Sequence, residues 1–199
     1  MRYIIMADGN STRWNNYLGI PKHLIRIDGE TLIERTVRLF REHDEACEII
    51  VTSHNKDYEF SGAVRHQPVN NVLEIDRFTK ELISDNMCFL YGDTYYSEHA
   101  IHTIVQTEVE DVLFFGNENS IVAIKIVNGK LFDEHVSHVR SLFISGVIEN
   151  CIGWQVYQSI LGLPFKGKEI ADKYVVIRDE TMDFNEPEDY LTRKERDLS

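Results

Sequence analysis

The stretch YIIMADGNSTRW (residues 3–14) decides the fold, because a short apolar run gives way abruptly to a glycine, small polar residues and an arginine. Residues 2–6 have the composition of a buried strand. Gly9 then lets the backbone turn sharply, and Arg13 follows in the same loop. Ligands of open α/β sheets bind at the carboxyl ends of the strands, so we expect a binding site at this loop.

The rest of the chain alternates short runs rich in β-branched residues with amphipathic stretches. This alternation is typical of βαβ units and predicts a mostly parallel, three-layer α/β/α sheet protein. Strands are predicted at 2–6, 48–53, 87–91, 111–115, 121–127 and 173–177. Helices are predicted at 31–41, 71–84, 97–106, 149–161 and 187–197. Residues 115–150 are the hardest to assign, and we interpret them as an antiparallel excursion from the main sheet.

The helix over 31–41 has the best local signals. A turn at Asp28-Gly29 precedes it, and Thr31 with Glu34 forms the sequence pattern of a capping box. One apolar stripe is formed by Ile33, Val37 and Phe40.

Composition and charge narrow the class of protein. The 199 residues are 43% hydrophobic and 27% charged, which is globular composition and fits one domain spanning residues 1–199. The net charge of −12 disfavours nucleic acid and anionic membranes as partners. No apolar run approaches the roughly 20 residues of a membrane span, and the N-terminal run is too short for a signal peptide. We therefore expect a cytoplasmic protein, and the sequence allows a homodimer.

The cysteines and histidines give no sign of a disulfide or a zinc site. Cys47, Cys88 and Cys151 are an odd number at wide spacing and are expected to be buried free thiols. The histidine pairs of HAIH (99–102) and HVSH (135–138) are expected at solvated helix positions.

Basic residues are concentrated at the N-terminus. Residues 1–41 carry seven Lys or Arg against four Asp or Glu, in a chain that is acidic overall. We interpret this as a local site for a small anion. Arg35, Arg38 and Arg41 are instead interpreted as the solvated face of the helix at 31–41.

A polyphosphate suits the loop after the first strand. Backbone N–H groups beside Gly9 can hold phosphate oxygens, and Arg13 adds a fork of donors. Lys22 follows Pro21, whose fixed φ limits where the lysine points, and supplies a second positive charge. The patterns G-x-G-x-x-G and G-x-x-x-x-G-K-[ST] are absent from the sequence, which disfavours NAD-dependent dehydrogenases and P-loop ATPases.

An aspartate after a buried-looking strand predicts a magnesium site. Asp93 follows MCFLY (87–91) and Gly92, and Mg²⁺ prefers one or two carboxylates with phosphate and water oxygens. MDFNEPEDY (182–190) offers a further ligand in Asp183 or Asn185. Glu188 and Asp189 are interpreted as the first turn of a helix that begins at Pro187.

These motifs together resemble the nucleotidyltransferases that activate phosphorylated small molecules with an NTP. That family includes sugar-1-phosphate nucleotidyltransferases, the cytidylyltransferases for phosphocholine and methylerythritol phosphate, and the molybdenum-cofactor guanylyltransferases. MADGNSTRW (6–14) resembles the family signature L-A-A-G-x-G-T-R-M, the Pro21-Lys22 pair matches its P-K, and FLYGDTYY (89–96) and MDFNEPEDY follow in the family's order. The resemblance is close over the first 40 residues, recurs near 88–96 and 182–190, and fades between.

The resemblance implies a glycosyltransferase-A-like, Rossmann-like fold and an enzyme that uses Mg²⁺. Arg13 and Lys22 are the implied catalytic residues on the triphosphate, and the implied metal ligands are Asp93 and Asn185, with Asp183 next. The implied nucleotide-binding set is Ala7, Asp8, Gly9, Asn10, Ser11, Thr12, Arg13, Lys22 and Gly92. Two departures from the signature are Ser11, in place of a second glycine, and Asp8, in place of a small residue.

Asp8 is the one indication of which base is bound. A carboxylate can accept a hydrogen bond from the exocyclic amine of cytosine or guanine, which uracil and thymine lack. This favours CTP or GTP, and the likeness of YGDTYY (91–96) to phosphocholine-type cytidylyltransferases favours CTP. The alternative is that Asp8 only caps its loop.

The acceptor is a phosphorylated small molecule whose identity the sequence leaves open. Trp154 can stack on a sugar, hold a cationic head group, or pack in the core with Tyr157 and Ile160. Further acceptor-contact candidates are Tyr95, Tyr96 and Glu149.

The sequence also leaves open four alternatives to a cytidylyltransferase. Two are nucleotidyltransferases with other substrates, namely a guanylyltransferase of the molybdenum-cofactor type and a sugar-1-phosphate nucleotidyltransferase. The third is a nucleotide-sugar glycosyltransferase, which is disfavoured because Gly92-Asp93-Thr94 is not a D-x-D motif. The fourth is a catalytically silent nucleotide-binding regulator.

Overall fold

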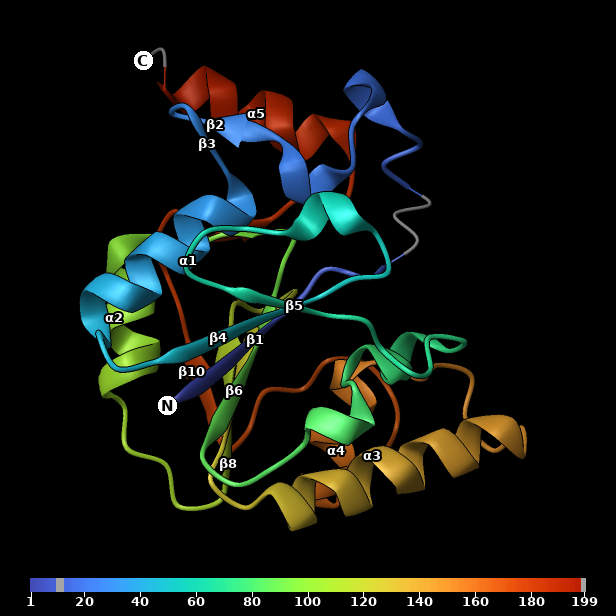
Figure 1. Cartoon of the computed structure of the whole chain (residues 1–199). Coiled ribbons are helices and arrows are strands. Elements are labelled where there is room, and N and C mark those ends of the chain that lie inside the picture. Colours follow the sequence, from blue (N-terminus) through green and yellow to red (C-terminus); the bar gives the residue numbers. More distant parts are fainter. Residues whose placement is uncertain (10–12, 198–199) are drawn as a thin grey trace.

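The computed structural model describes residues 1–9 and 13–197 and has a seven-stranded sheet at its centre (Figure 1). The strand order is β10-β8-β9-β6-β1-β4-β5. These strands are β1 (Arg2–Met6), β4 (Glu48–Thr52), β5 (Val64–His66), β6 (Met87–Tyr91), β8 (Val112–Gly116), β9 (Ile121–Ile126) and β10 (Tyr174–Val176). Every pairing is parallel except those of β9, which runs antiparallel to both β6 and β8.

Helices cover both faces of this sheet. Helices α1 (Leu32–His43) and α2 (Glu98–Gln106) lie on one face, and α3 (Gly129–Ile144) and α4 (Gly153–Leu161) lie on the other (Figure 1). Residues of β1 alternate between the two cores, with Tyr3 and Ile5 facing α1 and α2. Ile4 and Met6 pack in the core beneath α3 and α4. The predicted α/β/α architecture with a mixed, mostly parallel sheet is therefore confirmed.

A smaller apolar cluster joins the N-terminal loops to α5 (Pro187–Asp197). It contains Trp14, Ile25, Leu32, Phe184 and Tyr190, among others. The hairpin of β2 (Arg26–Ile27) and β3 (Glu30–Thr31) lies beside α5 in Figure 1. Asp28 and Gly29 both have positive φ, as a tight hairpin turn requires. A second short ribbon pairs β7 (Thr94–Tyr95) with β11 (Met182–Asp183).

Helices α1 and α5 begin where the local sequence signals predict. The Thr31 hydroxyl accepts from the Glu34 backbone N–H at 3.1 Å, and the Glu34 carboxylate accepts from the Thr31 N–H at 2.8 Å. The Asp189 carboxylate accepts from the backbone N–H groups of Asn185 and Glu186, which confirms its place at the start of α5.

The predicted helix at 71–84 is wrong. The chain instead forms two single turns, η4 (Glu74–Arg77) and η5 (Lys80–Leu82). The Asp76 carboxylate accepts from the backbone N–H groups of Val72 and Leu73, and Ile75 and Phe78 are buried. A spacing of three residues between two core side chains suits the tighter 3₁₀ turn, so tertiary contacts override the helical pattern.

Residues 115–150 contain the expected antiparallel strand, β9, and also the unpredicted helix α3. Asn128 caps α3 by accepting from the Leu131 N–H at 3.0 Å. Its apolar positions Phe132, Val136 and Val139 are spaced for one helical face. The predicted helix at 149–161 begins later, at Gly153.

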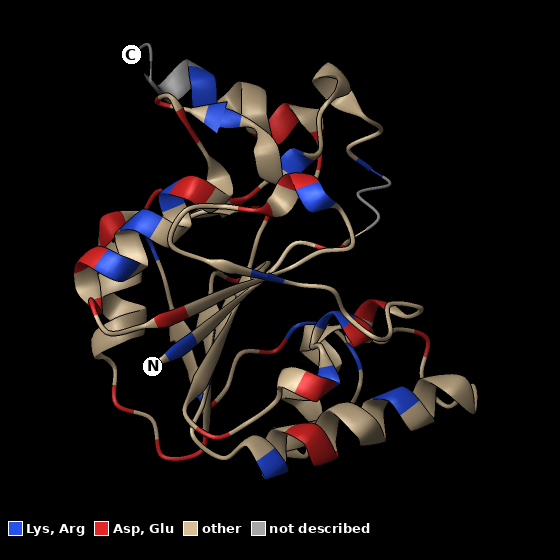
Figure 2. Ribbon diagram, viewed as in Figure 1, with Lys and Arg blue, Asp and Glu red and all other residues tan. Residues whose placement is uncertain are grey.

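Other surface and core predictions are confirmed in part. The three cysteines are buried and unpaired with one another. His99, His102 and His138 are exposed on helices, whereas His135 is half-buried against Ser159. Arginines and glutamates are interspersed along α1 (Figure 2), and Arg38 pairs with Glu30 and Glu42. Arg35 differs from the prediction, because it is half-buried and its guanidinium lies 4.6 Å from the centroid of the Tyr95 ring. Within the described residues, no helix is long and apolar enough to cross a membrane.

Candidate functional site

Three strands end side by side and deliver the predicted site loops to one edge of the sheet. Strand β1 lies between β4 and β6, and both pairings are parallel and in register. The loop 7–9 therefore lies beside residues 53–55, which follow β4, and beside Gly92 and Asp93, which follow β6. Gly92 is required here, because a Cβ would lie 2.7 Å from the carbonyl oxygen of Met6.

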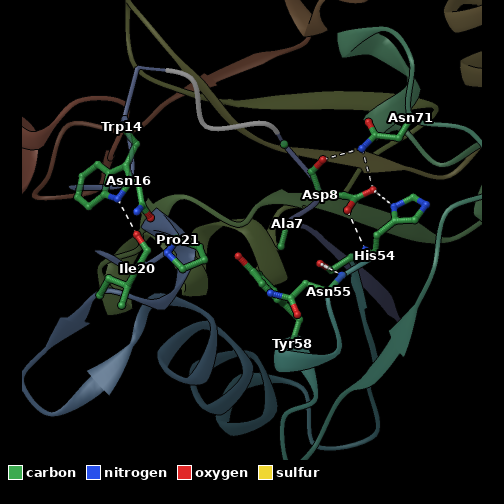
Figure 3. A pocket seen from close by; sticks show the side chains of 12 residues that line it. Ala7, Asp8, Trp14, Asn16, Ile20, Pro21, His54, Asn55, Tyr58 and Asn71 are labelled. Atoms are coloured by element: carbon green, nitrogen blue, oxygen red, sulfur yellow. Dashed lines mark hydrogen bonds and ion pairs between the residues drawn. The ribbon is translucent and has the colours of Figure 1, made fainter. Parts of the chain in front are cut away.

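A first cavity of about 630 Å³ opens beside β1 and β4 (Figure 3). Trp14, Ile20, Pro21 and Tyr58 give it apolar and aromatic walls. Its polar groups and its floor come from Ala7, Asp8, Gly9, Asn16, Ser53, His54, Asn55 and Asn71. Its size suits a nucleoside, because small-molecule sites have about 300–1,000 Å³.

The Asp8 carboxylate holds the walls of this cavity together. One oxygen accepts from the backbone N–H of His54 at 2.8 Å, and the other contacts His54 Nδ1 at 2.6 Å and the Asn71 amide at 2.8 Å. The Asn71 amide also donates to the Asp8 carbonyl oxygen at 2.7 Å. Figure 3 shows Asp8 between these two side chains. His54 and Asn71 were not predicted, and the sequence has no motif that marks them.

Lys22 and Asp93 form a buried ion pair, with side chains 9% and 13% exposed. The turn η2 (Lys22–Leu24), which follows Pro21, directs the lysine into the protein. Burial alone would raise the pKa of Asp93, but the charges of Lys22, His23 and Arg77 lower it below its usual value. Asp93 is therefore a carboxylate at neutral pH.

A second cavity of about 270 Å³ contains the predicted metal ligands and Arg13. It is lined by Arg13, Asp93, Asp183 and Asn185, which come from three distant parts of the chain. The β7–β11 ribbon aligns Asp183 with Thr94 and so brings it next to Asp93 in the fold. Arg13 Nη2 donates to Asn185 Oδ1 at 2.8 Å.

The donor set at this cavity fits magnesium. Asp93, Asp183 and Asn185 offer hard oxygen atoms, and Ser120 donates to one Asp183 oxygen at 3.0 Å while the Asn185 amide donates to the other. Among the described residues there is no group of three or more His, Cys, Asp or Glu placed to hold a metal. Two carboxylates with an amide suit Mg²⁺, which takes its other oxygens from phosphates and water.

The predicted acceptor residues are separated by the fold. Trp154 lines the second cavity, although it is only 5% exposed. Tyr95 and Tyr96 are core residues, 3% and 1% exposed, and neither is among the residues that line the two cavities. Tyr96 donates its hydroxyl to the carbonyl oxygen of Val122 at 2.6 Å, so its packing replaces the predicted contact with the acceptor. Glu149 is exposed in the loop before α4 and lines neither cavity.

Several predicted nucleotide-binding residues lie outside the described part of the chain. These are Asn10, Ser11 and Thr12. Ala7, Asp8 and Gly9 line the first cavity, and Arg13 lines the second. Lys22 is not among the residues that line either cavity and is linked to the second one through its ion pair with Asp93.

Two partial sequence matches show what the N-terminal part of the chain is similar to. The family model of the MobA-like NTP transferase domain matches residues 3–85. A segment of 55 residues, 28% of this chain, is 42% identical to the bifunctional ribulose 5-phosphate reductase/CDP-ribitol pyrophosphorylase of Haemophilus influenzae. That segment spans only 11% of the larger protein.

Solved structures agree over nearly the whole length. The CTP:phosphocholine cytidylyltransferase of Streptococcus pneumoniae is 16% identical with a TM-score of 0.59, over 100% of this chain and 99% of its own. The inositol-1-phosphate CTP transferase of T. maritima is 15% identical with a TM-score of 0.59, over 94% and 90%. The 2-C-methyl-D-erythritol 4-phosphate cytidylyltransferase of Thermus thermophilus is 16% identical with the same score, over 100% and 98%. The overall fold is thus the one seen in these nucleotidyltransferases.

Proposed function

We propose that this protein transfers a nucleoside monophosphate, CMP in preference to others, from an NTP to a phosphorylated small molecule. The observation that carries the proposal is the position of the two cavities on either side of the end of β1. Ala7, Asp8 and Gly9 line the larger cavity, and the preceding residue, Met6, lines the smaller one. A nucleoside in the first cavity and an acceptor in the second would meet at this loop. Residues 1–199 would form one such domain.

The chemistry needs no protein base. A phosphomonoester with a second pKa near 6 is largely a dianion at neutral pH, so its oxygen can attack the α-phosphorus directly. A bond forms between this oxygen and the α-phosphorus, and the bond from that phosphorus to the bridging oxygen breaks. Pyrophosphate leaves with the electron pair. The protein must therefore align two polyanions and neutralise their charge.

The charged side chains at the second cavity suit this task. Arg13 offers a planar fork of donors to phosphate oxygens, and Lys22 offers a point charge at the end of its buried stem. Asp93, Asp183 and Asn185 would hold Mg²⁺. When bound there, the metal supplies positive charge to the phosphate oxygens and orients them. Chelation by EDTA is expected to abolish turnover, and added Mg²⁺ is expected to restore it.

Asp8 lines the first cavity, but its carboxylate oxygens already contact His54 and Asn71, so it can favour a base with an exocyclic amine only by exchanging one of these contacts. Cytosine, guanine and adenine carry such an amine and uracil does not, and among them we propose CTP first and GTP as the alternative. The aromatic and amide walls of the first cavity accommodate a base by stacking and hydrogen bonding. CTP is also favoured by the three similar solved structures described above, which are cytidylyltransferases or a CTP transferase.

The second cavity favours a hydroxyl-rich acceptor over one with a cationic head group. Lys168 Nζ already lies 5.6 Å from the centroid of the Trp154 ring and donates to the carbonyl oxygen of Asn119. A second cation on the same ring would be repelled by this ammonium group. Asn119, Ser120 and Glu74 add hydrogen-bonding groups to the lining. Phosphorylated sugars and polyols, including ribitol 5-phosphate, are therefore preferred to phosphocholine.

Pyrophosphate release decides between the proposal and its alternatives. The protein is incubated with Mg²⁺, each of CTP, GTP, UTP and ATP, and each of ribitol 5-phosphate, sugar 1-phosphates, inositol 1-phosphate, methylerythritol 4-phosphate and phosphocholine. We expect pyrophosphate with CTP and a polyol or sugar phosphate. A molybdenum-cofactor type enzyme would instead require GTP and its own acceptor. A glycosyltransferase would release a nucleoside diphosphate from a nucleotide sugar, and a silent regulator would release neither product.

A further inference from the structure

Gly9 leaves room for a guanidinium group. Its φ lies outside the left-handed region, so backbone conformation does not demand glycine here. A Cβ at this position would lie 3.0 Å from Nη2, 3.1 Å from Cζ and 3.3 Å from Nε of Arg77. Contacts of 3.0–3.3 Å are tight for a carbon atom, so a side chain at position 9 would push the guanidinium group of Arg77 away by a few tenths of an ångström. The glycine of the nucleotide loop therefore lets Arg77 lie directly against this loop.

Arg77 is carried on a turn that is firmly anchored in the core. The neighbouring residues Ile75 and Phe78 are 0% and 3% exposed, and the Phe78 ring packs on Phe89 of β6 at 5.3 Å between centroids. Asp76 accepts from Arg140 of α3 at 2.9 Å. The backbone that carries Arg77 is thus held by both the sheet and a helix, which fixes where its side chain can reach.

The Arg77 side chain is placed between the two cavities. It lines the second cavity together with Arg13, Asp93 and Asp183, while its guanidinium covers Gly9, which lines the first. Its charge contributes to lowering the pKa of Asp93. Among the described residues its ion-pair partner is Glu74, at 3.4 Å from Nη1, on the same turn. With 30% of the side chain exposed, the group remains accessible from the cavity.

We propose that Arg77 is a catalytic residue that binds phosphoryl oxygens at the junction of the two cavities, a role additional to those of Arg13 and Lys22. This inference rests on the proposed function. Negative charge accumulates where the acceptor oxygen approaches the α-phosphorus, and a planar guanidinium presents two parallel donors to such oxygens. Arg77 transfers no proton. Glu74 holds one edge of the guanidinium and leaves the other toward Gly9.

The test compares Arg77→Met with Lys80→Met. Lys80 is a cation three residues further on, 70% exposed and absent from the lining of both cavities, so its loss controls for surface charge. For Arg77→Met, kcat/KM for pyrophosphate release is expected to fall about 100-fold, as when one oriented electrostatic donor is removed. Lys80→Met is expected to match the wild type within about twofold. Arg77→Lys keeps the positive charge but loses the planar pair of donors. Its kcat/KM is therefore expected to lie between those of Arg77→Met and Lys80→Met.

A structural role is separated from a catalytic one by chemical rescue. Guanidinium chloride at low millimolar concentration is expected to restore part of the turnover of Arg77→Ala and to leave Lys80→Met unchanged. Urea unfolding midpoints of the Arg77 variants are expected to match the wild type. If Arg77→Met turns over like Lys80→Met while the wild type is active, the role of Arg77 is refuted and the proposed function stands.

A different outcome concerns the proposed function itself. If the wild type releases no pyrophosphate with any nucleotide and acceptor, that function fails, and Arg77 is then judged by calorimetric binding of inorganic pyrophosphate in the presence of Mg²⁺. About tenfold weaker binding by Arg77→Met than by Lys80→Met supports an anion site at Arg77. Equal binding by the two variants overturns it.

Discussion

Lys22 Nζ and the Asp93 carboxylate are in hydrogen-bond contact across 71 positions of sequence, and both side chains are nearly buried. The contact joins the turn that follows Pro21 to the end of β6. It places a residue expected on the triphosphate against a residue expected on the metal. Lys22 thereby neutralises Asp93 in the protein without ligands, and phosphate and metal would each compete for one member of the pair.

Removing one member of this pair is expected to destabilise the protein. Lys22→Met leaves a buried carboxylate unpaired, and Asp93→Asn leaves a buried ammonium, each at a cost of about 3 kcal/mol. The double variant removes both charges and should lose less than the sum of the two. Urea unfolding at neutral pH measures these free energies. Arg2→Met breaks the exposed pair with Glu48 and is the control, expected to cost less than about 1 kcal/mol.

Equal stability of Lys22→Met and Arg2→Met would contradict this assignment. So would strict additivity in the double variant, because charges in contact must show a coupling free energy.

A second prediction concerns the pH dependence of stability. His23 is buried beside Tyr58, with Nδ1 3.0 Å from the hydroxyl oxygen, and burial lowers the pKa of His23 to about 4. Between this pKa and that of an unfolded histidine, near 6.5, the unfolded chain binds more protons, so stability falls as the pH falls. From about pH 7 to about pH 5 this histidine should cost roughly 2 kcal/mol of unfolding free energy.

Comparison with His23→Phe isolates this contribution. The stability of the wild type relative to the variant should decrease by that amount over the same interval, measured by urea unfolding. His138→Gln, at an exposed position of α3, should follow the wild type. A constant difference between the wild type and His23→Phe would show that His23 takes up its proton equally in both states.

Much of the fold is predictable from residues 1–41. The apolar run of β1, the Asp28-Gly29 turn and the capping box of Thr31 act through neighbours in sequence, and each signal fixes local structure by itself. The turns at 74–82 could not be predicted in this way. Ile75, Asp76 and Phe78 are held by β6 and α3, and such contacts are invisible in a local pattern.

The residues of the candidate site likewise fall into those that a local motif marks and those that only the fold brings together. Arg13, Lys22 and Asp93 each follow a strand or a proline, so sequence position alone marks them. Arg77 and Lys168 lie in segments without a motif, and only the folded chain brings them to the second cavity. Outside the site, the role of Lys125 is equally unmarked in the sequence. Its ammonium group caps the end of α2 by donating to the carbonyl oxygens of residues 104, 105 and 107, at 2.7–3.1 Å.

The preference for a base is the third prediction. If Asp8 accepts from an exocyclic amine, CTP and GTP should bind the wild type about tenfold more tightly than UTP, since a hydrogen bond to a charged group is worth roughly 1.5–3 kcal/mol. Asp8→Ala should remove this difference. Isothermal titration of CTP, GTP, UTP and ATP with Mg²⁺ measures it.

Asn71→Ala is the matched control for Asp8. It removes the Asn71 amide, which contacts both Asp8 Oδ2 and the Asp8 carbonyl oxygen, and leaves the carboxylate in place. If Asn71→Ala alone equalises the nucleotides, Asp8 acts by positioning Asn71. Equal binding of all four nucleotides by the wild type would eliminate Asp8 as the determinant of base preference.

Arg13 provides the fourth prediction. Its guanidinium lies at the second cavity, 64% exposed, and donates to Asn185, one of the candidate metal ligands. Arg13→Ala is expected to lower turnover by about two orders of magnitude or more, because loss of an electrostatic donor at the reacting phosphate costs about 3–4 kcal/mol. Arg26→Ala, which removes an equally exposed arginine from the β2–β3 hairpin, should leave turnover unchanged. Steady-state pyrophosphate release measures both variants. Since Arg13 has few stabilising contacts, its loss should leave the urea midpoint unaltered, and turnover close to that of the wild type would exclude Arg13 from the reaction.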